Sequence, residues 1–372
     1  MYSETDLEAA VAGGVLTPEQ AAAFRDFIAT GRQLPAADEE HFRLLTGFND
    51  IFVGIAATIL LIAVGWIGQY LGPKIDYAGP SPLGPLFVAA SAWGLAEFFT
   101  RKRRMALPSI ILLLAFAAGS FFATLFTEVL IVGERHMVPQ TMFVMVGIAS
   151  AVACAATFPH WRRFKVPITI AVGAAAVAAL VVTLVASLLI GNGDPDLISN
   201  AQWQNIRQAV EGTVLLLGIA TFLLAMRWDA SDRRRETRRA DVAFWLHLLA
   251  APMIVHPVFS LLGLTTGEAS VGAAMVVILL YVALALVALA IDRRALLVSA
   301  LAYVLWAINA LFQQSGAVEL SVALTALVIG SALLLLSAFW ANARRVVVGP
   351  LPESLQAKLP LLNRPATRVV PA

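Results

Sequence analysis

Long runs of hydrophobic residues, separated by short polar segments, make up the chain from about residue 51 to residue 340. Each run is about 17 to 25 residues long, the length that an α-helix needs to cross roughly 30 Å of hydrocarbon. None shows the alternating polarity over about ten residues that is typical of a membrane-spanning β-strand. The pattern predicts an all-α polytopic membrane helix bundle of about ten transmembrane helices, at residues 51–70, 83–100, 107–128, 138–158, 166–190, 210–227, 242–264, 270–291, 295–312 and 318–340.

The polar N-terminal segment carries helix start and stop signals. Thr17 and Gln20 have the spacing of a reciprocal capping box, with Pro18 at the first helical position between them. Gly13 and Gly14 end a helix just before this start. Residues 1–34 are therefore expected to form a helical hairpin.

The residues DLEAAVAGGVLTPEQAAAF of this hairpin resemble the N-terminal module of a large bacterial group of uncharacterised multi-span membrane proteins. They are also similar to the short paired-helix modules found at the ends of many bacterial proteins. The resemblance covers a small part of the chain. It implies a cytoplasmic module that contacts a protein partner or a second copy of the chain, and it implies no enzymatic activity.

The remaining segments complete the domain organisation. Residues 35–50 read either as an amphipathic connector that lies at the membrane surface or as a plain connector helix. Residues 51–343 form the ten-helix transmembrane domain. The tail at residues 344–372 contains five prolines in a polar setting, so it is expected to be mostly disordered.

Charge is distributed unevenly between the two sides of the predicted bundle. Seventeen basic residues lie in alternate connections, whereas the other connections hold Lys74, Arg135 and Arg207. The positive-inside rule places the basic connections and both termini in the cytoplasm of a bacterial inner membrane. The most basic connection is also expected to contact anionic lipid headgroups through Arg233, Arg234, Arg235, Arg238 and Arg239.

Composition supports this class of protein. Apolar residues make up 59% of the chain and charged residues only 13%, against roughly 25% charged residues in a soluble domain. The single cysteine, Cys154, cannot form an intramolecular disulfide and reads as a packing residue.

The seventh predicted span contains the best candidates for a ligand or proton site. It carries Pro252, His256 and Pro257 deep in the membrane, with His247 nearer the cytoplasmic end. Each proline removes a backbone donor, and a kinked helix with a buried imidazole could bind a proton, a cation or a substrate. Alternatively, the histidine is neutral and hydrogen-bonded to a freed carbonyl or to a neighbouring helix. His247 and His256 lie about 180° apart around a straight helix.

Carboxylates near the span ends are further candidates. Glu97 precedes Arg101 by four residues, which favours an interfacial salt bridge, and Glu128 ends the third span near the outer surface. Glu211, Glu268 and Glu319 stand at the outer, N-terminal ends of three spans. Helix dipoles explain acids at these places, and an acidic vestibule that concentrates cations is the alternative.

Known catalytic and nucleotide-binding signatures are absent from the sequence. We find no P-loop, GxGxxG, HExxH, GxSxG or paired-cysteine pattern, so neither enzymatic activity nor a metal or cofactor is expected. The basic clusters are short and lie at span ends, which argues against nucleic-acid binding. An intramembrane enzyme using His256 as a base would lack a second catalytic group at a suitable spacing.

Two functional classes are left open by the sequence. The first is a scaffold, sensor or assembly factor that uses its N-terminal hairpin for protein contacts. The alternative is a small-molecule or cation secondary transporter of the ten-helix inverted-repeat type, with its site near the kinked seventh span. Residues 191–209 would then mark the midpoint, but the second span has no proline to match those of the seventh.

Overall fold

The computed structural model describes residue 7 and residues 10–31, 48–75, 79–133, 138–191, 199–232, 237–262, 271–314, 320–356, 359–360 and 362. All regular secondary structure in these residues is helical. The chain divides into two compact units, one of Met1–Phe42 with Asn363–Ala372 and one of Arg43–Leu362.

The smaller unit contains α2 (Pro18–Gly31), whose start has the predicted capping box. The Thr17 backbone N–H donates to Gln20 Oε1 at 2.9 Å, and the Gln20 backbone N–H donates to Thr17 Oγ1 at 3.2 Å. Hydrogen bonds from the backbone N–H of Glu19 and from Thr17 lower the pKa of the Glu19 carboxyl. Gly14 ends the preceding turn with a φ of 70°. Residues 32–47, which include most of the expected connector, lie outside the described residues.

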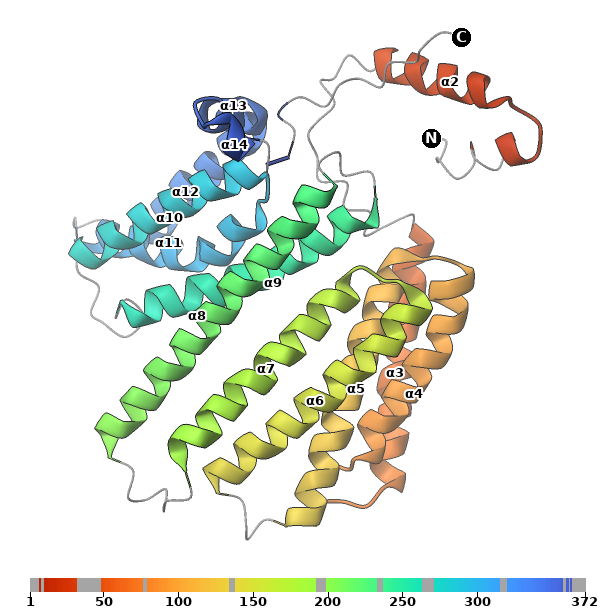
Figure 1. The fold of residues 1–372 in the computed structure, drawn as a ribbon, viewed down its shortest axis with the longest axis vertical. Coiled ribbons are helices and arrows are strands. Elements are labelled where there is room, and N and C mark those ends of the chain that lie inside the picture. The colour runs from red at the N-terminus through yellow and green to blue at the C-terminus, as the bar shows by residue number, and fades with distance from the viewer. Residues whose placement is uncertain are drawn as a thin grey trace. The chain divides into compact units, whose positions relative to one another are not determined.

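The larger unit is a polytopic membrane helix bundle (Figure 1). Among the described residues, nine helices are long and apolar enough to cross a membrane, and a tenth helix has a shorter apolar stretch at Leu296–Asn309. These ten coincide with the ten predicted spans. They are α3 (Phe48–Leu71), α4 (Leu83–Ala96) with its π-helical continuation η1 (Glu97–Lys102), α5 (Ala106–Val132), α6 (Pro139–Phe164), α7 (Ile168–Ile190), α8 (Asn200–Ser231), α9 (Arg238–Leu261), α10 (Val271–Ile291), α11 (Ala295–Gln314) and α12 (Ser321–Ala338).

The first five helices of the bundle, α3 to α7, each pack on the next in chain order (Figure 1). Helix α7 contacts α5 and α6 as well as α8 and α9, so it lies between the two groups of helices. In the second group, α8 packs along α9, and α11 contacts α9, α10 and α12. We call the ends of the helices that meet at residues 103–105, 165–167, 232–237 and 292–294 the basic end of the bundle.

Helix α8 starts earlier than the predicted sixth span. Ser199 caps it, because the Gln202 backbone N–H donates to Ser199 Oγ at 3.3 Å and the Ser199 backbone N–H donates to Gln202 Oε1 at 2.8 Å. The segment before residue 210 therefore extends this span and is not a separate interfacial helix.

The tail also differs from the prediction of disorder from residue 344. Helix α13 (Trp340–Val348) runs past that position, and a short helix, α14 (Glu353–Gln356), follows it. Arg344, Val348 and Leu359 are buried, the latter two in the hydrophobic core at the end of α10. Hydrophobic burial orders this part of the tail, and residues 363–372 lie outside the described residues.

Candidate functional site

A buried ionic cluster of Asp229, His247 and Arg293 joins α8, α9 and the turn between α10 and α11. Arg293 Nη2 donates to Asp229 Oδ1 at 2.5 Å, and Arg293 Nε donates to Asp229 Oδ2 at 3.3 Å. His247 Nε2 lies 3.0 Å from the same Oδ2 atom. The side chains of Asp229, His247 and Arg293 are only 1%, 0% and 3% exposed. We call these three residues the Asp229 cluster.

Arg293 has a further partner, because its Nη2 donates to the Ala240 carbonyl at 3.2 Å. The carboxylate between a histidine and an arginine compensates a buried positive charge that would otherwise be costly in a low-dielectric interior. The cluster therefore holds together three segments that are far apart in the sequence. The sequence places Arg293 in a basic connection, and the structure adds that Arg293 is buried and paired there.

Asp292 anchors the other side of the same turn. Its Oδ1 accepts a hydrogen bond from Trp340 Nε1 at 2.8 Å, and its Oδ2 lies 3.9 Å from Arg344 Nη1. Arg344 Nη2 also donates to the Pro360 carbonyl at 2.6 Å. Trp340 and Arg344 are both buried within the protein.

Glu97 links the first group of helices at the basic end. The predicted pair with Arg101 is present, with Arg101 Nη1 donating to Glu97 Oε2 at 3.2 Å. Sequence analysis missed a second partner, Arg163 on α6, whose Nε and Nη2 donate to the two carboxylate oxygens at 2.7 and 3.0 Å. Glu97 thus fastens η1 to α6.

His256 does not lie deep in the bundle. Helix α9 ends at Leu261, so His256 stands five residues, about 8 Å, from the end opposite the basic end. Its side chain is exposed, and its Nδ1 lies 2.5 Å from the Tyr303 hydroxyl on α11. The full burial of His247 and the exposure of His256 agree with their predicted placement on opposite sides of α9.

The two prolines of α9 have different surroundings. Pro252 is exposed, whereas Pro257 is buried. Pro257 leaves the Met253 carbonyl without its usual helical donor. Gly218 of α8 packs against this backbone, where a Cβ atom on the glycine would lie 2.9 Å from the Met253 carbonyl oxygen. The two helices therefore lie close together at Gly218 and the Met253 backbone.

The predicted acidic vestibule stays a prediction. Glu211 lies about three turns inside α8, because that helix begins at Asn200, so the dipole of a nearby helix start does not explain its position. Its Oε1 accepts a hydrogen bond from Ser260 Oγ of α9 at 2.6 Å. Glu268 and Glu319 lie outside the described residues. Glu128 has one carboxylate oxygen that is buried and has no hydrogen-bond partner among the described residues.

His160 is a buried polar group that sequence analysis missed. It is enclosed by the rings of Trp93, Phe116 and Phe164, and its Nδ1 lies 3.3 Å from Thr169 Oγ1. His160 comes just before Trp161 and three basic residues, a run that is typical of the membrane interface. The sequence therefore did not indicate that His160 is buried. Trp93 packs between helices, as its mid-span position predicts.

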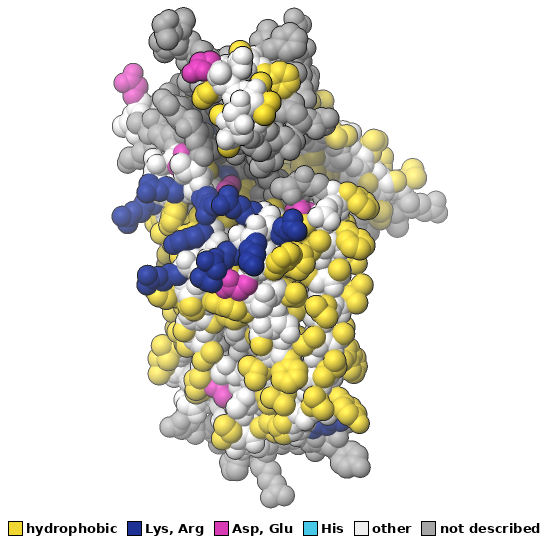
Figure 2. Space-filling model, turned by 90° about the vertical axis from the view of Figure 1, so that its right-hand side faces the viewer, with side chains coloured by type: hydrophobic (Ala, Val, Ile, Leu, Met, Phe, Trp, Pro, Cys, Tyr) yellow, Lys and Arg dark blue, Asp and Glu magenta, His cyan; other side chains and the backbone are white. Residues whose placement is uncertain are grey.

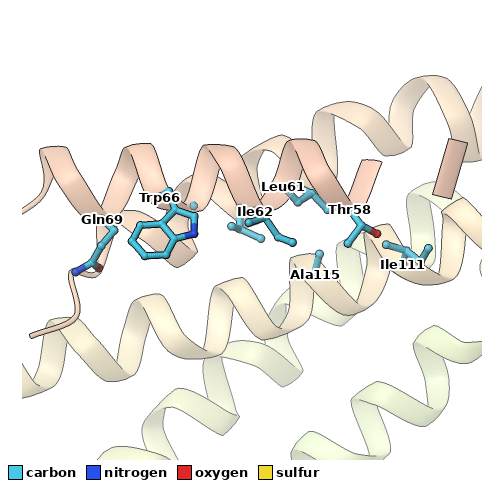
Figure 3. A pocket seen from close by; sticks show the side chains of 9 residues that line it. Thr58, Leu61, Ile62, Trp66, Gln69, Ile111 and Ala115 are labelled. Carbon is cyan, nitrogen blue, oxygen red and sulfur yellow. The ribbon is translucent and has the colours of Figure 1, made fainter. Parts of the chain in front are cut away.

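An open pocket of about 440 Å³ lies between α3, α4 and α5 (Figure 3). Its lining is almost entirely apolar. The Gln69 amide at one end is already bonded, because its Nε2 donates to the Gly79 carbonyl at 2.9 Å and its Oε1 accepts from the Ser81 backbone N–H at 2.6 Å. The lining residues are Thr58, Leu61, Ile62, Gly65, Trp66, Gln69, Val88, Ile111 and Ala115.

The loop with the highest density of arginines is only partly described. Arg233, Arg234 and Arg235 lie outside the described residues, whereas Arg238 and Arg239 are exposed at the start of α9. Asp232 closes the loop by accepting hydrogen bonds from the Thr237 backbone N–H at 2.9 Å and its hydroxyl at 2.7 Å.

A search for metal ligands among the described residues finds no group of three or more His, Cys, Asp or Glu side chains. No protein-family model, curated protein or solved structure matches this chain. The resemblance of the N-terminal hairpin to a bacterial module therefore stays a prediction.

Proposed function

We propose that this integral membrane protein is a scaffold, sensor or assembly factor of the bacterial inner membrane. Its N-terminal hairpin, residues 1–34, contacts a protein partner, and both termini lie in the cytoplasm. One observation carries the proposal: the buried side chains of Asp229, His247 and Arg293 pair with one another and join separate helices. The Asp229 cluster and the Glu97 pairs fasten helices together, which is what a stable platform for protein contacts needs.

The charge distribution supports the orientation. The basic residues gather at the turns of one end of the bundle, and such turns stay on the cytoplasmic side during insertion. With an even number of spans, the hairpin and the tail share that side.

Deletion of residues 1–34 tests the proposal. The truncated protein should insert and keep the thermal stability of its membrane domain, because the hairpin belongs to a separate compact unit. It should lose any protein that co-purifies with the full chain from its native host. Retention of the same partners by the truncated protein would contradict the assignment of the contact to the hairpin.

A secondary transporter is the alternative, and one observation favours it. His256 lies on α9, a helix that contains two prolines, and its exposed side chain is bonded to Tyr303 of α11. An imidazole in such a place is the kind of group that binds a proton or a cation. The helix contacts give the inverted-repeat arrangement little support. Helix α3 packs on α4 and α5, whereas its counterpart α8 packs on α7 and α9.

Flux in proteoliposomes distinguishes the alternative. A proton or cation transporter should show flux that His256→Ala abolishes and that deletion of residues 1–34 leaves intact. The scaffold proposal predicts no flux above that of protein-free liposomes.

A further inference from the structure

The turns η1–α5 and α6–α7 bring seven basic residues together at the basic end of the first helix group. The bonds between Glu97 and Arg163 tie the two turns to each other. All seven side chains are exposed, and Figure 2 shows Lys and Arg side chains gathered in one band beside a hydrophobic surface. We call this group the basic patch: Arg101, Lys102, Arg103, Arg104, Arg162, Arg163 and Lys165.

Most of the basic patch has no carboxylate partner within the described part of the chain. Glu97 pairs with Arg101 and Arg163. The other five residues carry positive charge that no described acidic side chain neutralises. In the second helix group, Arg293 and Arg344 are buried and interact with Asp229 and Asp292, whereas Arg238, Arg239 and Arg345 are exposed.

Aromatic rings hold three of these cations close to the hydrophobic surface. Arg103 lies over the ring of Phe98 at 5.4 Å, Arg162 over Phe158 at 5.7 Å, and Lys165 over Trp161 at 5.3 Å. Phe158 is 64% exposed and Phe98 is 43% exposed on apolar helices. Trp161 stands near the end of its membrane helix, where tryptophan rings lie at the depth of lipid headgroups, so we expect the cations around it to lie near the level of the phosphates.

We propose that the basic patch is a binding site for the phosphate of an anionic phospholipid. The guanidinium groups of Arg103 and Arg162 can donate paired hydrogen bonds to phosphate oxygens, and Lys165 adds a point charge. The exposed rings of Phe98 and Phe158 contact the glycerol and upper acyl region of the same lipid. A nucleic acid would not use this apolar edge, which lies within the bilayer.

Lipid titration of the purified, delipidated full chain by native mass spectrometry tests the site. The probes are phosphatidylglycerol, phosphatidylcholine and inorganic phosphate. The test variant is Arg103→Gln/Arg162→Gln/Lys165→Gln. The matched control is Lys74→Gln/Arg207→Gln/Arg345→Gln, which removes the same charge from exposed positions outside the basic patch.

The wild type should bind phosphatidylglycerol at least about tenfold more tightly than phosphatidylcholine, because the interactions that distinguish the two lipids are those of the headgroup charge. The test variant should lose this preference and the control should keep it. An unchanged preference in the test variant, or an equal loss in the control, would overturn the proposal. So would displacement of phosphatidylglycerol by an equal concentration of inorganic phosphate, which would indicate a site for a free anion.

Incorrect folding of the triple variant would make its lipid affinity uninterpretable, so the single variant Arg162→Gln is measured beside it. Arg162 is exposed, and among the described residues its side chain interacts with the ring of Phe158. Its replacement should therefore leave the melting temperature unchanged. It should lower the affinity for phosphatidylglycerol by about threefold or more. An unchanged affinity in a folded Arg162→Gln protein would count against the site.

Discussion

Asp229 on α8 and Arg293 after α10 are 64 residues apart in the chain, and the Arg293 Nη2 atom lies 2.5 Å from the Asp229 Oδ1 atom with both side chains buried. Removal of either partner leaves an uncompensated charge inside the protein. We therefore expect Arg293→Ala to lower the free energy of unfolding by about 3 to 5 kcal/mol. Thermal or denaturant unfolding in detergent measures this change.

The neighbouring Arg294→Ala is the control for that prediction, because Arg294 is only partly buried and lies over the Trp340 ring. Its effect should be about 1 kcal/mol or less. The double variant Asp229→Leu/Arg293→Leu should recover part of the loss, since it removes both buried charges. Equal effects of Arg293→Ala and Arg294→Ala would contradict a buried ionic cluster.

The two histidines of α9 should differ sharply in their contribution to stability. His247 is fully buried against Asp229, whereas His256 is exposed and bonded to Tyr303. His247→Ala is expected to cost about 2 to 4 kcal/mol, and His256→Ala about 1 kcal/mol or less. Melting temperatures of the two variants, measured under one condition, provide the comparison. A larger loss for His256→Ala would show that this histidine is packed inside the bundle.

Because α8 packs closely on α9, the stability of the protein should depend strongly on the glycine at position 218. A Cβ atom there would lie 2.9 Å from the Met253 backbone, so Gly218→Ala should destabilise the protein by about 1 to 3 kcal/mol. Gly212→Ala on the same helix is the matched control, because a Cβ at Gly212 meets nothing within 4 Å. The control should be neutral or slightly stabilising, since alanine favours a helix. Similar melting temperatures for the two variants would argue against the close packing.

The proposed orientation predicts the location of five points along the chain. Reporter fusions after residues 104, 165, 240, 294 and 345 should all report cytoplasm, because the basic residues before them stay on that side. Fusions after residues 74 and 207 are the controls and should report periplasm. A clear periplasmic signal at any of the first five points would contradict the ten-span arrangement.

Helix positions could be predicted because the length and polarity of a run determine whether it crosses a bilayer. The Glu97–Arg101 pair was predictable for a similar reason, since both residues lie on one helix one turn apart. The partners Arg163 and Arg293 were not predictable, because their pairing depends on which helices pack together. Asp229 and Arg293 each end an apolar run beside other charged residues, so nothing local distinguishes them from exposed loop residues.

The positions of His256 and Glu211 along their helices differ from the predicted positions for another reason. Both were placed from the expected ends of spans, and the structure changes those ends. Helix α8 begins at Asn200, ten residues before the predicted start of the sixth span, and α9 ends three residues before the predicted limit. Differences of this size move a side chain by up to about three helical turns or to another depth, which changes its interpretation.

Photo-crosslinking from the hairpin of the full-length protein tests the central claim most directly. A benzoylphenylalanine at Val15, which is 77% exposed in the smaller unit, should give a discrete crosslinked protein in cells. The same probe at Leu188, which is 73% exposed on α7 near the end opposite the basic end, is the control and should not give that product. Absence of any crosslinked protein from Val15, in cells where the protein is folded and inserted, would contradict a function based on contacts of the hairpin.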